Sequence, residues 1–596
     1  MLTSRIQVVN NIPLLNIDGT LYTPLAYTTY FDECGDWYEF IKNNYKIFFV
    51  NMSFNTLPIN NTTGFTPFRT GIFENAVPDY SEFEKTVYSI LNECPDALIF
   101  PRIHISMPRK WINDNLYETV ETPNGGNRES LFSDKFKNDG AKLLKTVLKH
   151  IADADYSHRI AGYQLCGGTT QEWIHHDLFG SYSEMGLKKF EEWAFEKHGL
   201  ENIKLPQKEN LTNENLDTET SLYYRFCSEK TTEAIEHFAR VTKDFTNGKQ
   251  LVGIFYGYNG FVRDPLWGLH GLGEIIDSPY IDFFSSPCCY DDGRSLGLDW
   301  GDMLPVDSIK LHGKLCFIEC DIRTHLTRQM QESRPDEYPD DIMPLVNSDG
   351  SRTVWKGPDT PEHSISAIRK AFAHQIVKAS GIWWFDMWGG WYRHRDIMEE
   401  LKRMHRIYDD LINKNTDNSP CAEIALFIDE KAYANAPRNS CFTDTVNVIR
   451  VAMGNTGIPF DTYMVEDAPE VMHKYKAAIF TTPVPSEAGT EAIELCRRNY
   501  IPCIIPTKDK FYYSTPELRD ILITAGIHCY NDKNNVIYCS NGILGIHTKT
   551  DGETTIKLPG KYNTKALLGT DISQTETDLI TLDMLKHDTI LLELSY

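Results

Sequence analysis

Short apolar segments alternate with longer amphipathic segments over the first four hundred residues of the chain. Eight short segments combine β-branched and aromatic residues, which is typical of buried strands in a parallel sheet. They lie at residues 24–31, 46–53, 97–106, 160–165, 251–257, 281–286, 314–320 and 381–388. Helical periodicity between them is clearest at residues 36–44, 82–93, 141–153, 183–199, 221–245 and 364–379. Eight strands in alternation with helices predict a (β/α)8 TIM barrel, which we place at residues 1–412.

The pattern changes twice after the barrel. A polar stretch at residues 411–420 reads as a linker, and apolar and amphipathic segments then alternate again over residues 420–530. This alternation predicts a smaller, flavodoxin-like α/β domain, and the absence of a Gly-x-Gly-x-x-Gly or Walker loop gives no reason to expect a nucleotide there. Residues 531–596 carry turn residues every few positions, which predicts a small antiparallel, sandwich-like β domain.

Charge and composition exclude several classes of partner. The chain has 83 acidic and 59 basic residues and a formal charge of −24, so it would repel both nucleic acid and an anionic membrane. No window approaches the length of a membrane span, and the first twenty residues do not resemble a secretory signal. The 14 cysteines form no Cys-x-x-Cys pair and no zinc-like cluster, which favours a cytoplasmic protein with reduced thiols, no metal and no cofactor.

Two glutamates follow strands of the predicted barrel, where the catalytic groups of such barrels lie. Glu172 follows the fourth strand after a Gly-Gly-Thr-Thr loop, and Glu319 closes the seventh. An isolated carboxylate at the end of an apolar strand is too costly to leave in the core, so it must reach solvent, a cation or a ligand. Two carboxyls about 5 to 5.5 Å apart are what a retaining glycoside hydrolase requires, whereas about 6.5 Å or more would favour an inverting one.

The neighbours of Glu172 suggest the role of acid/base. Trp173, His175 and His176 follow it, and partial burial among them would raise its pKa and suit it to proton donation. The alternative is structural, with Glu172 in the first turn of a helix that a threonine of the preceding loop caps.

Glu319 has the features expected of a nucleophile. Arg323 follows closely and would favour a charged carboxylate; the alternative is that Glu319 is a structural partner for a nearby arginine. The Pro-, Asp- and Ser-rich segment at residues 323–360 directly follows the strand of Glu319. Long loops at that end of a barrel strand usually build the site or its lid.

Aromatic and polar residues near other strand ends are candidates for contacts with a sugar. Residue parity puts Trp384, Asp386 and Trp388 of the last strand on one side, where indoles would stack on sugar rings and the carboxylate would accept hydroxyls. The alternative is that these rings pack the barrel against its helices. Further candidates, each equally explained by a structural role, are Arg102, His104, Trp111 and Tyr290.

The order of these elements resembles clan A glycoside hydrolases. Over nearly its entire length the chain resembles family 42 β-galactosidases and, equally, family 164 β-mannosidases. The strand "AGYQL" at residues 161–165 is similar to the Gly-Trp-Gln-Ile strand of family 42, and "AEIALFIDEKAY" at residues 422–433 to the opening of its trimerisation domain. The resemblance implies Glu172 as acid/base, Glu319 as nucleophile and a homotrimer assembled through the middle domain.

The chain departs from the family pattern beside the acid/base. Clan A usually has Asn there, touching the 2-hydroxyl of the sugar, whereas this chain has Gln171 after an inserted Gly-Gly-Thr-Thr; the zinc-binding cysteine cluster of some family 42 members is absent as well. We therefore expect Gln171 to bind substrate but leave the sugar open. The leading hypothesis is a retaining exo-β-glycosidase that removes galactosides or mannosides from oligosaccharides, and the alternative is a catalytically silent sugar-binding or scaffold protein.

Overall fold

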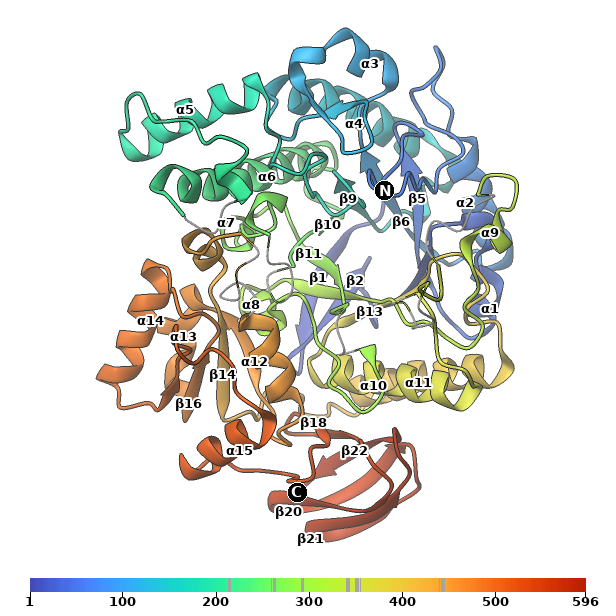
Figure 1. Ribbon diagram of the computed structural model, residues 1–596. Helices are drawn as coiled ribbons and strands as arrows, with labels where there is room; N and C mark the ends of the chain where they lie inside the picture. Colours follow the sequence, from blue (N-terminus) through green and yellow to red (C-terminus); the bar gives the residue numbers. More distant parts are fainter. Residues whose placement is uncertain are drawn as a thin grey trace.

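A closed barrel of eight parallel strands forms the largest unit of the computed structural model (Figure 1). The structure describes residues 1–212, 216–258, 260, 264–290, 294–338, 344–348, 353, 355–438, 440 and 445–596. The barrel strands are β4 (Leu25–Thr29), β5 (Ile47–Ser53), β6 (Leu98–Ile105), β9 (Gly162–Gly167), β10 (Leu251–Phe255), β11 (Phe283–Pro287), β12 (Leu315–Cys320) and β13 (Gly381–Asp386). Each coincides with a strand predicted from the sequence, so the predicted TIM barrel is confirmed.

Helices surround the barrel, as Figure 1 shows. The main ones are α1 (Trp37–Lys42), α2 (Ser81–Glu93), α4 (Asp134–Asp153), α5 (Glu184–His198), α6 (Thr218–Phe245), α8 (Val306–Leu311), α10 (Pro361–Val377) and α11 (Arg395–Asn413). Helix α4 begins seven residues before its predicted start because Ser133 caps it, accepting a 2.9 Å hydrogen bond from the Phe136 amide. Among the described residues, no helix has both the length and the apolar character needed to span a membrane.

An antiparallel sheet that the sequence did not predict closes the amino end of the barrel. Its strands are β1 (Ser4–Val9), β2 (Ile12–Ile17) and β3 (Thr20–Tyr22), and β1 is tied to the barrel by the Ser4 amide, which donates to the Lys249 carbonyl at 2.8 Å. Leu15 and Ile17 of β2 belong to the same apolar cluster as the inward-facing rings of the barrel, Phe100 and Phe317 among them. The sheet is therefore the floor of the barrel interior.

Substitution of Leu15 tests whether β2 packs as the floor of the barrel interior. Leu15 is fully buried in the barrel cluster, so Leu15→Ala is expected to lower the free energy of unfolding by about 2 to 5 kcal/mol, measured by denaturant titration. Leu21→Ala on β3, where the side chain is 40% exposed, is the control and should change stability by less than about 0.5 kcal/mol. Equal effects of the two substitutions would contradict the description of β2 as the floor.

The middle domain has a parallel four-stranded sheet in the order β15-β14-β16-β17, as expected for a flavodoxin-like unit. Its strands are β14 (Ile424–Ile428), β15 (Asp461–Met464), β16 (Ala477–Phe480) and β17 (Cys503–Ile504), and its helices include α12 (Thr445–Gly454), α14 (Glu487–Arg498) and α15 (Thr515–Thr524). Buried ion pairs join it to the barrel: the Lys378 ammonium after α10 lies 2.9 Å from Asp307 and 2.8 Å from Asp461.

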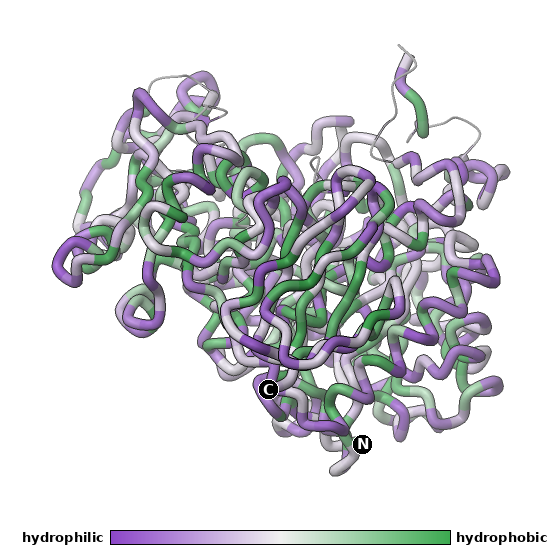
Figure 2. The backbone as a smooth tube through the Cα atoms, turned by 90° about the horizontal axis from the view of Figure 1, so that it is seen from below, coloured by the Kyte–Doolittle hydropathy of each residue, from purple (hydrophilic) through white to green (hydrophobic). Residues whose placement is uncertain are grey.

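The C-terminal strands form one antiparallel sheet in the order β18-β19-β22-β20-β21. They are β18 (Val536–Cys539), β19 (Ile543–His547), β20 (Gly552–Leu568), β21 (Ser573–Met584) and β22 (Thr589–Ser595). The antiparallel β domain is confirmed, but it is a single sheet rather than the two facing sheets of a sandwich. Seen from below, this part of the chain lies in front, and hydrophobic stretches alternate with hydrophilic ones along it (Figure 2).

Candidate active site

Buried polar side chains converge at the carboxyl ends of the barrel strands. Arg102 and His104 on β6, Gln164 on β9 and Glu319 on β12 are each at most 2% exposed, and β6 and β9 pair so that Arg102 lies beside Gln164. Among the described residues, three nitrogens of Arg102, both ring nitrogens of His104, both amide atoms of Gln164 and Oε2 of Glu319 have no hydrogen-bond partner. Such groups are costly to bury unpaired, so their convergence at the barrel mouth marks a site for a polar ligand.

A tight loop, not a helix, carries Glu172. Gly168, Thr170, Gln171 and Trp173 all have φ between +57° and +69°, a conformation that costs a non-glycine residue about 1 kcal/mol or more. The next α-helix begins only at Glu184, so the alternative of a helix first-turn acid is wrong. Backbone strain concentrated beside a buried carboxyl is typical of a functional site.

Trp173 anchors this loop against the end of β9. Its ring is fully buried, and its amide donates a 2.7 Å hydrogen bond to the Gly167 carbonyl. A side chain on Gly167 would lie 2.8 Å from that ring, and one on Gly168 would lie 2.3 Å from the Ile174 carbonyl oxygen. The two glycines are therefore required for the loop to fold back onto the strand and hold Glu172 at the barrel mouth.

Burial raises the pKa of Glu172 to about 7. The side chain is 9% exposed, and the Thr170 hydroxyl donates a 2.5 Å hydrogen bond to its Oε2. Hydrogen bonding by Thr170 and Tyr258 and the positive charge of Arg102 oppose the rise, because each favours the ionised form. A carboxyl with this pKa is substantially protonated near neutral pH, which suits a general acid.

Glu319 also has a pKa well above its ordinary value. Burial is the main cause, and the negative charges of Asp321 and Glu172 add to it, while Arg102 and Arg294 lower it. The charge of Glu172 acts on Glu319, so the two carboxyls lie within electrostatic reach of each other. The negative charge of Glu172 therefore makes ionisation of Glu319 less favourable.

Arg102 is the cation common to both carboxyls. Its guanidinium carbon lies 4.7 Å from the ring centroids of Phe255 and Trp383 and 5.4 Å from that of Tyr30. Its charge lowers the pKa of Glu172 and of Glu319. The aromatic rings fix a fully buried cation beside the carboxyl pair without occupying its N–H donors, which stay available to a ligand.

The prediction that Arg323 supports Glu319 is wrong. Arg323 instead forms a close ion pair with Asp321, which also receives Arg294 at 3.0 Å, and these two cations hold the pKa of Asp321 below its ordinary value. The cations that act on Glu319 are Arg102 and Arg294. Sequence proximity misled because a nearer carboxylate, Asp321, lies between Glu319 and Arg323 in the chain and takes the ion pair.

The side predicted for the residues of β13 is wrong. Trp383 lies in the cluster inside the barrel, whereas Trp384 donates to the Tyr45 hydroxyl at 3.0 Å and packs in the cluster between barrel and helices. Asp386 has the same parity as Trp384, is fully buried, and accepts a 3.1 Å hydrogen bond from the Tyr27 hydroxyl. The geometry therefore does not support substrate contacts by Trp384 or Asp386.

Three other predicted contacts lie at or beside the barrel mouth. Gln171 is fully buried, and neither atom of its amide has a partner among the described residues. The Tyr290 ring lies 4.0 Å from the Arg294 guanidinium, and burial, followed by the negative charges of Asp321 and Glu172, raises the pKa of its hydroxyl. Trp388 follows the end of β13, and the centroid of its ring lies 5.6 Å from that of Phe31 and 5.4 Å from that of Phe65. It is thus in aromatic contact with the rim of the site.

The remaining candidates have structural partners. His175 contacts the Ser181 hydroxyl at 2.8 Å and the Thr231 hydroxyl at 3.0 Å, and burial lowers its pKa to about 3. His176 contacts Glu129 at 3.3 Å, also within the core. The indole of Trp111, on α3 (Arg109–Asp114), donates to Asp139 of α4 at 3.0 Å.

The predicted lid segment is described only in part. Within it α9 (Met330–Ser333) is followed by Arg334, which pairs with Glu33 at 2.7 Å and Glu337 at 3.1 Å. Tyr338 donates to the Thr66 carbonyl, so this part packs over loops that follow β4 and β5. Residues 339–343, 349–352 and 354 of the predicted segment lie outside the described residues.

Sequence reasoning missed four residues of the site: Gln164, Tyr258, Arg294 and Trp383. Gln164 has a recognisable signal, because it is a lone amide within an apolar strand. It lies two residues before Cys166, which faces the barrel interior, so its side chain faces the interior as well. Tyr258 carried another, because it directly follows the fifth predicted strand. Arg294 had no such signal because its contact with Asp321 is long-range.

The raised pKa of Glu172 predicts that an uncharged substitute at this position stabilises the fold at alkaline pH. The folded protein holds this proton up to about pH 7, whereas the carboxyl of the unfolded chain loses it near pH 4.5. The stabilisation of the fold by the protonated side chain is therefore complete below pH 4.5 and is lost as pH rises through 7. Glu172→Gln, which cannot ionise, is expected to raise stability by up to about 3 kcal/mol at about pH 8 and little at about pH 4. Denaturant titrations of both proteins at the two pH values test this, and a gain independent of pH would contradict it.

Comparison with known proteins shows which solved structures share this fold. No family model matches the chain, and no curated protein matches its sequence. Among solved structures it is similar to a family 42 β-galactosidase from G. stearothermophilus, with a TM-score of 0.61 and 9% identity over 96% of this chain and 98% of that one. It is similar to a β-galactosidase from Rahnella sp. R3 as well, with a TM-score of 0.62 and 10% identity over 96% of this chain and 98% of that one. It is also similar to an exo-carrageenase of family 42 from Bacteroides ovatus (0.59, 12%, 99% and 84%).

The barrel with its two smaller domains therefore has a glycoside hydrolase fold. More particularly, nearly the whole chain has the fold of the family 42 β-galactosidases of clan A.

Proposed function

We propose that the protein is a retaining exo-β-glycosidase that hydrolyses terminal β-linked galactosides or mannosides of oligosaccharides by double displacement. The observation that carries the proposal is the pair of buried carboxyls, Glu172 after β9 and Glu319 on β12, which interact electrostatically and share Arg102. The fold supports the same reaction class, because family 42 glycosidases have it.

In the first step Glu172, protonated, donates its proton to the glycosidic oxygen while Glu319, ionised, attacks the anomeric carbon. The bond to the leaving group breaks and a covalent glycosyl ester forms on Glu319. This step requires Glu172 to be neutral and Glu319 to be charged at the same time. Arg102 and Arg294 favour the negative charge on Glu319.

In the second step Glu172, now ionised, takes a proton from a water molecule that attacks the anomeric carbon, and the bond to Glu319 breaks. The free donors and acceptors of Arg102, His104, Gln164 and Gln171 are the groups available to the sugar hydroxyls. Buried polar groups that pair only with the correct hydroxyls discriminate strongly between sugars. We assign the specificity for the terminal sugar to these groups.

Galactoside is the first substrate to test, because the similar structures include several β-galactosidases, and mannoside is the second. We also propose a homotrimer assembled through the middle domain and a cytoplasmic location, on the sequence resemblance and the reduced-thiol composition described above.

A panel of nitrophenyl β-glycosides tests the proposed activity. We expect turnover of the β-galactoside or the β-mannoside, with the β-anomer of the sugar as the first product in NMR spectra. Glu319→Gln is the inactive control. If the wild type hydrolyses none of the panel, the protein is better described as a sugar-binding or scaffold protein, and if the α-anomer forms first, the enzyme inverts configuration.

A further inference from the structure

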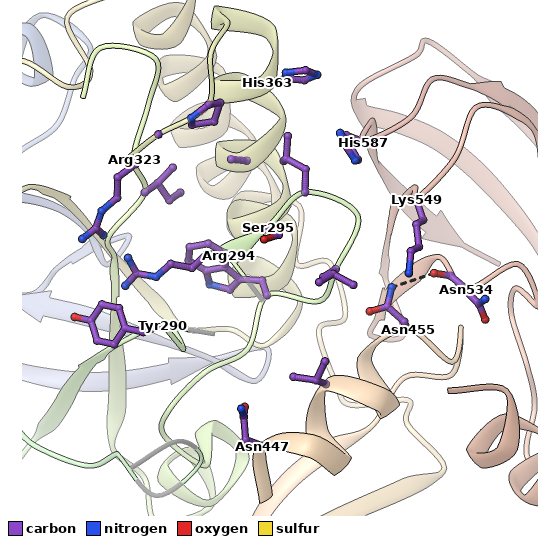
Figure 3. A pocket seen from close by; sticks show the side chains of 18 of the residues that line it. Tyr290, Arg294, Ser295, Arg323, His363, Asn447, Asn455, Asn534, Lys549 and His587 are labelled. Atoms are coloured by element: carbon purple, nitrogen blue, oxygen red, sulfur yellow. Dashed lines mark hydrogen bonds between the residues drawn. The ribbon is translucent and has the colours of Figure 1, made fainter. Parts of the chain in front are cut away.

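A large cleft lies beside the candidate active site. Its volume is about 1040 Å³, and residues of the barrel, the middle domain and the C-terminal sheet line it together. Tyr290, Asp321 and Arg323 are at its barrel end, next to Glu319. Figure 3 shows Tyr290, Arg294 and Arg323 on one side, with Asn455, Lys549 and His587 across the cleft. The cleft thus begins at the loops that follow β11 and β12 and reaches both smaller domains.

Its size exceeds what one sugar requires. Ligand pockets usually enclose about 300 to 1,000 Å³, so this cleft has room for several sugar units. The amides of Asn447 and Asn534 lie along it, and the Tyr512 ring, which is 62% exposed, lines it as well. Amides that bond hydroxyls and rings that stack on sugar faces are the usual lining of an oligosaccharide site.

The cleft is more cationic than the rest of this acidic chain. Among its described lining residues, four side chains are cationic (Arg294, Arg323, Lys356 and Lys549) and two are carboxylates (Asp321 and Asp359). The whole chain carries a formal charge of −24. Basic side chains gathered on one surface of an acidic protein favour an anionic ligand there.

Two arginines at the barrel end keep free donors. Arg323 is only 6% exposed, yet its Nε and Nη2, like Nη1 of Arg294, have no acceptor among the described residues. Asp321 neutralises only part of this pair, because one carboxylate faces two guanidinium groups. Guanidinium N–H groups in a fixed geometry match the oxygens of a sulfate or carboxylate.

We propose that this cleft binds the leaving-group portion of an anionic oligosaccharide, with a sulfate or carboxylate of the sugar chain on Arg294 and Arg323 and a further one near Lys549. The orientation rests on the proposed function, since the cleaved bond would lie between the barrel mouth and the cleft. The anionic preference itself rests only on the lining residues.

Lys549 is the residue to change, because its side chain is exposed and lies across the cleft from Arg294 and Arg323 (Figure 3). The experiment measures binding by calorimetry to full-length protein carrying Glu319→Gln, with a sulfated galacto-tetrasaccharide, its desulfated form and a galacturonate tetrasaccharide. We expect at least one anionic ligand to bind about tenfold tighter than the neutral one. Lys549→Glu should weaken that binding about fivefold to tenfold and leave the neutral ligand unaffected.

The matched control is Lys561→Glu, the same charge reversal on an exposed lysine of β20 outside the cleft. It should change neither affinity. Equal affinity for charged and neutral ligands, or equal effects of the two lysine substitutions, would overturn the proposal. The comparison of sulfate with carboxylate identifies the anion. Failure of the proposed function would show separately as no hydrolysis of nitrophenyl glycosides by the wild type.

Discussion

Glu319→Gln is expected to lower kcat/KM for every glycoside substrate by about 10⁴-fold or more while leaving the fold intact. The amide has nearly the shape of the carboxyl but cannot form the covalent ester on which the proposed double displacement depends. The substitution also removes a buried ionisable group with a raised pKa, so the free energy of unfolding should not fall. The measurements are steady-state kinetics and thermal melting.

Glu430→Gln is the matched control for this result. Glu430 is a buried carboxyl whose pKa burial raises to about 8, and it accepts hydrogen bonds from the Leu272 and Gly273 amides at 2.9 and 2.8 Å. It lies at the junction with the middle domain, so its loss should leave kcat/KM within about twofold. Comparable losses of activity in both variants would contradict a specific role for Glu319.

Glu172→Gln is expected to affect substrates unequally. An acid that protonates the leaving group contributes about 10²- to 10⁴-fold, and this contribution matters most when the leaving group is a sugar. The nitrophenyl leaving group needs little protonation, so the first step with it should slow much less. The measurement is kcat/KM for a natural disaccharide and for the nitrophenyl glycoside in the wild type and the variant.

The pH profile gives a second readout of the same substitution. Glu172 must be protonated in the first step, and its pKa is about 7, so wild-type kcat/KM should fall as pH rises above about 7. Glu172→Gln should abolish this alkaline limb. A limb that persists unchanged in the variant would show that another group supplies the proton.

The barrel was predictable because its signals are local. Each predicted parallel strand is a mostly apolar segment of six to ten residues between helical segments, and both features are visible in the sequence. The positions of Glu172 and Glu319 followed from the same logic, since an ionisable residue directly after a buried strand must lie at the barrel mouth.

The inward face of β13 was not predictable by alternation. Parallel barrel strands are buried on both sides, so apolar residues occupy both parities and do not mark the interior. The register between β12 and β13 determines which side chains of β13 face inward. Gly381 pairs with Phe317, and a side chain on Gly381 would lie 2.7 Å from the inward-facing Phe317 ring. This packing puts Trp383 inside and Trp384 outside.

The floor sheet was predictable in part. Asn10 and Asn11, and then Asp18 and Gly19, have positive φ, and such pairs are typical of two-residue hairpin turns. Its packing across the amino end of the barrel, however, depends on contacts between β2 and strands up to hundreds of residues away. No local sequence pattern predicts such contacts. The same holds for the ion pair of Asp321 with Arg294, which joins the loops that follow β11 and β12.

The most direct test of the account is to trap the covalent intermediate. The wild type is incubated with the activated 2-deoxy-2-fluoro derivative of the glycoside that the panel identifies, then digested and examined by mass spectrometry. The account predicts that a single fluorosugar is attached to the peptide containing Glu319 and that Glu319→Gln acquires none. Attachment to a different carboxylate, or release of the α-anomer from the unmodified substrate without any attachment, would contradict it.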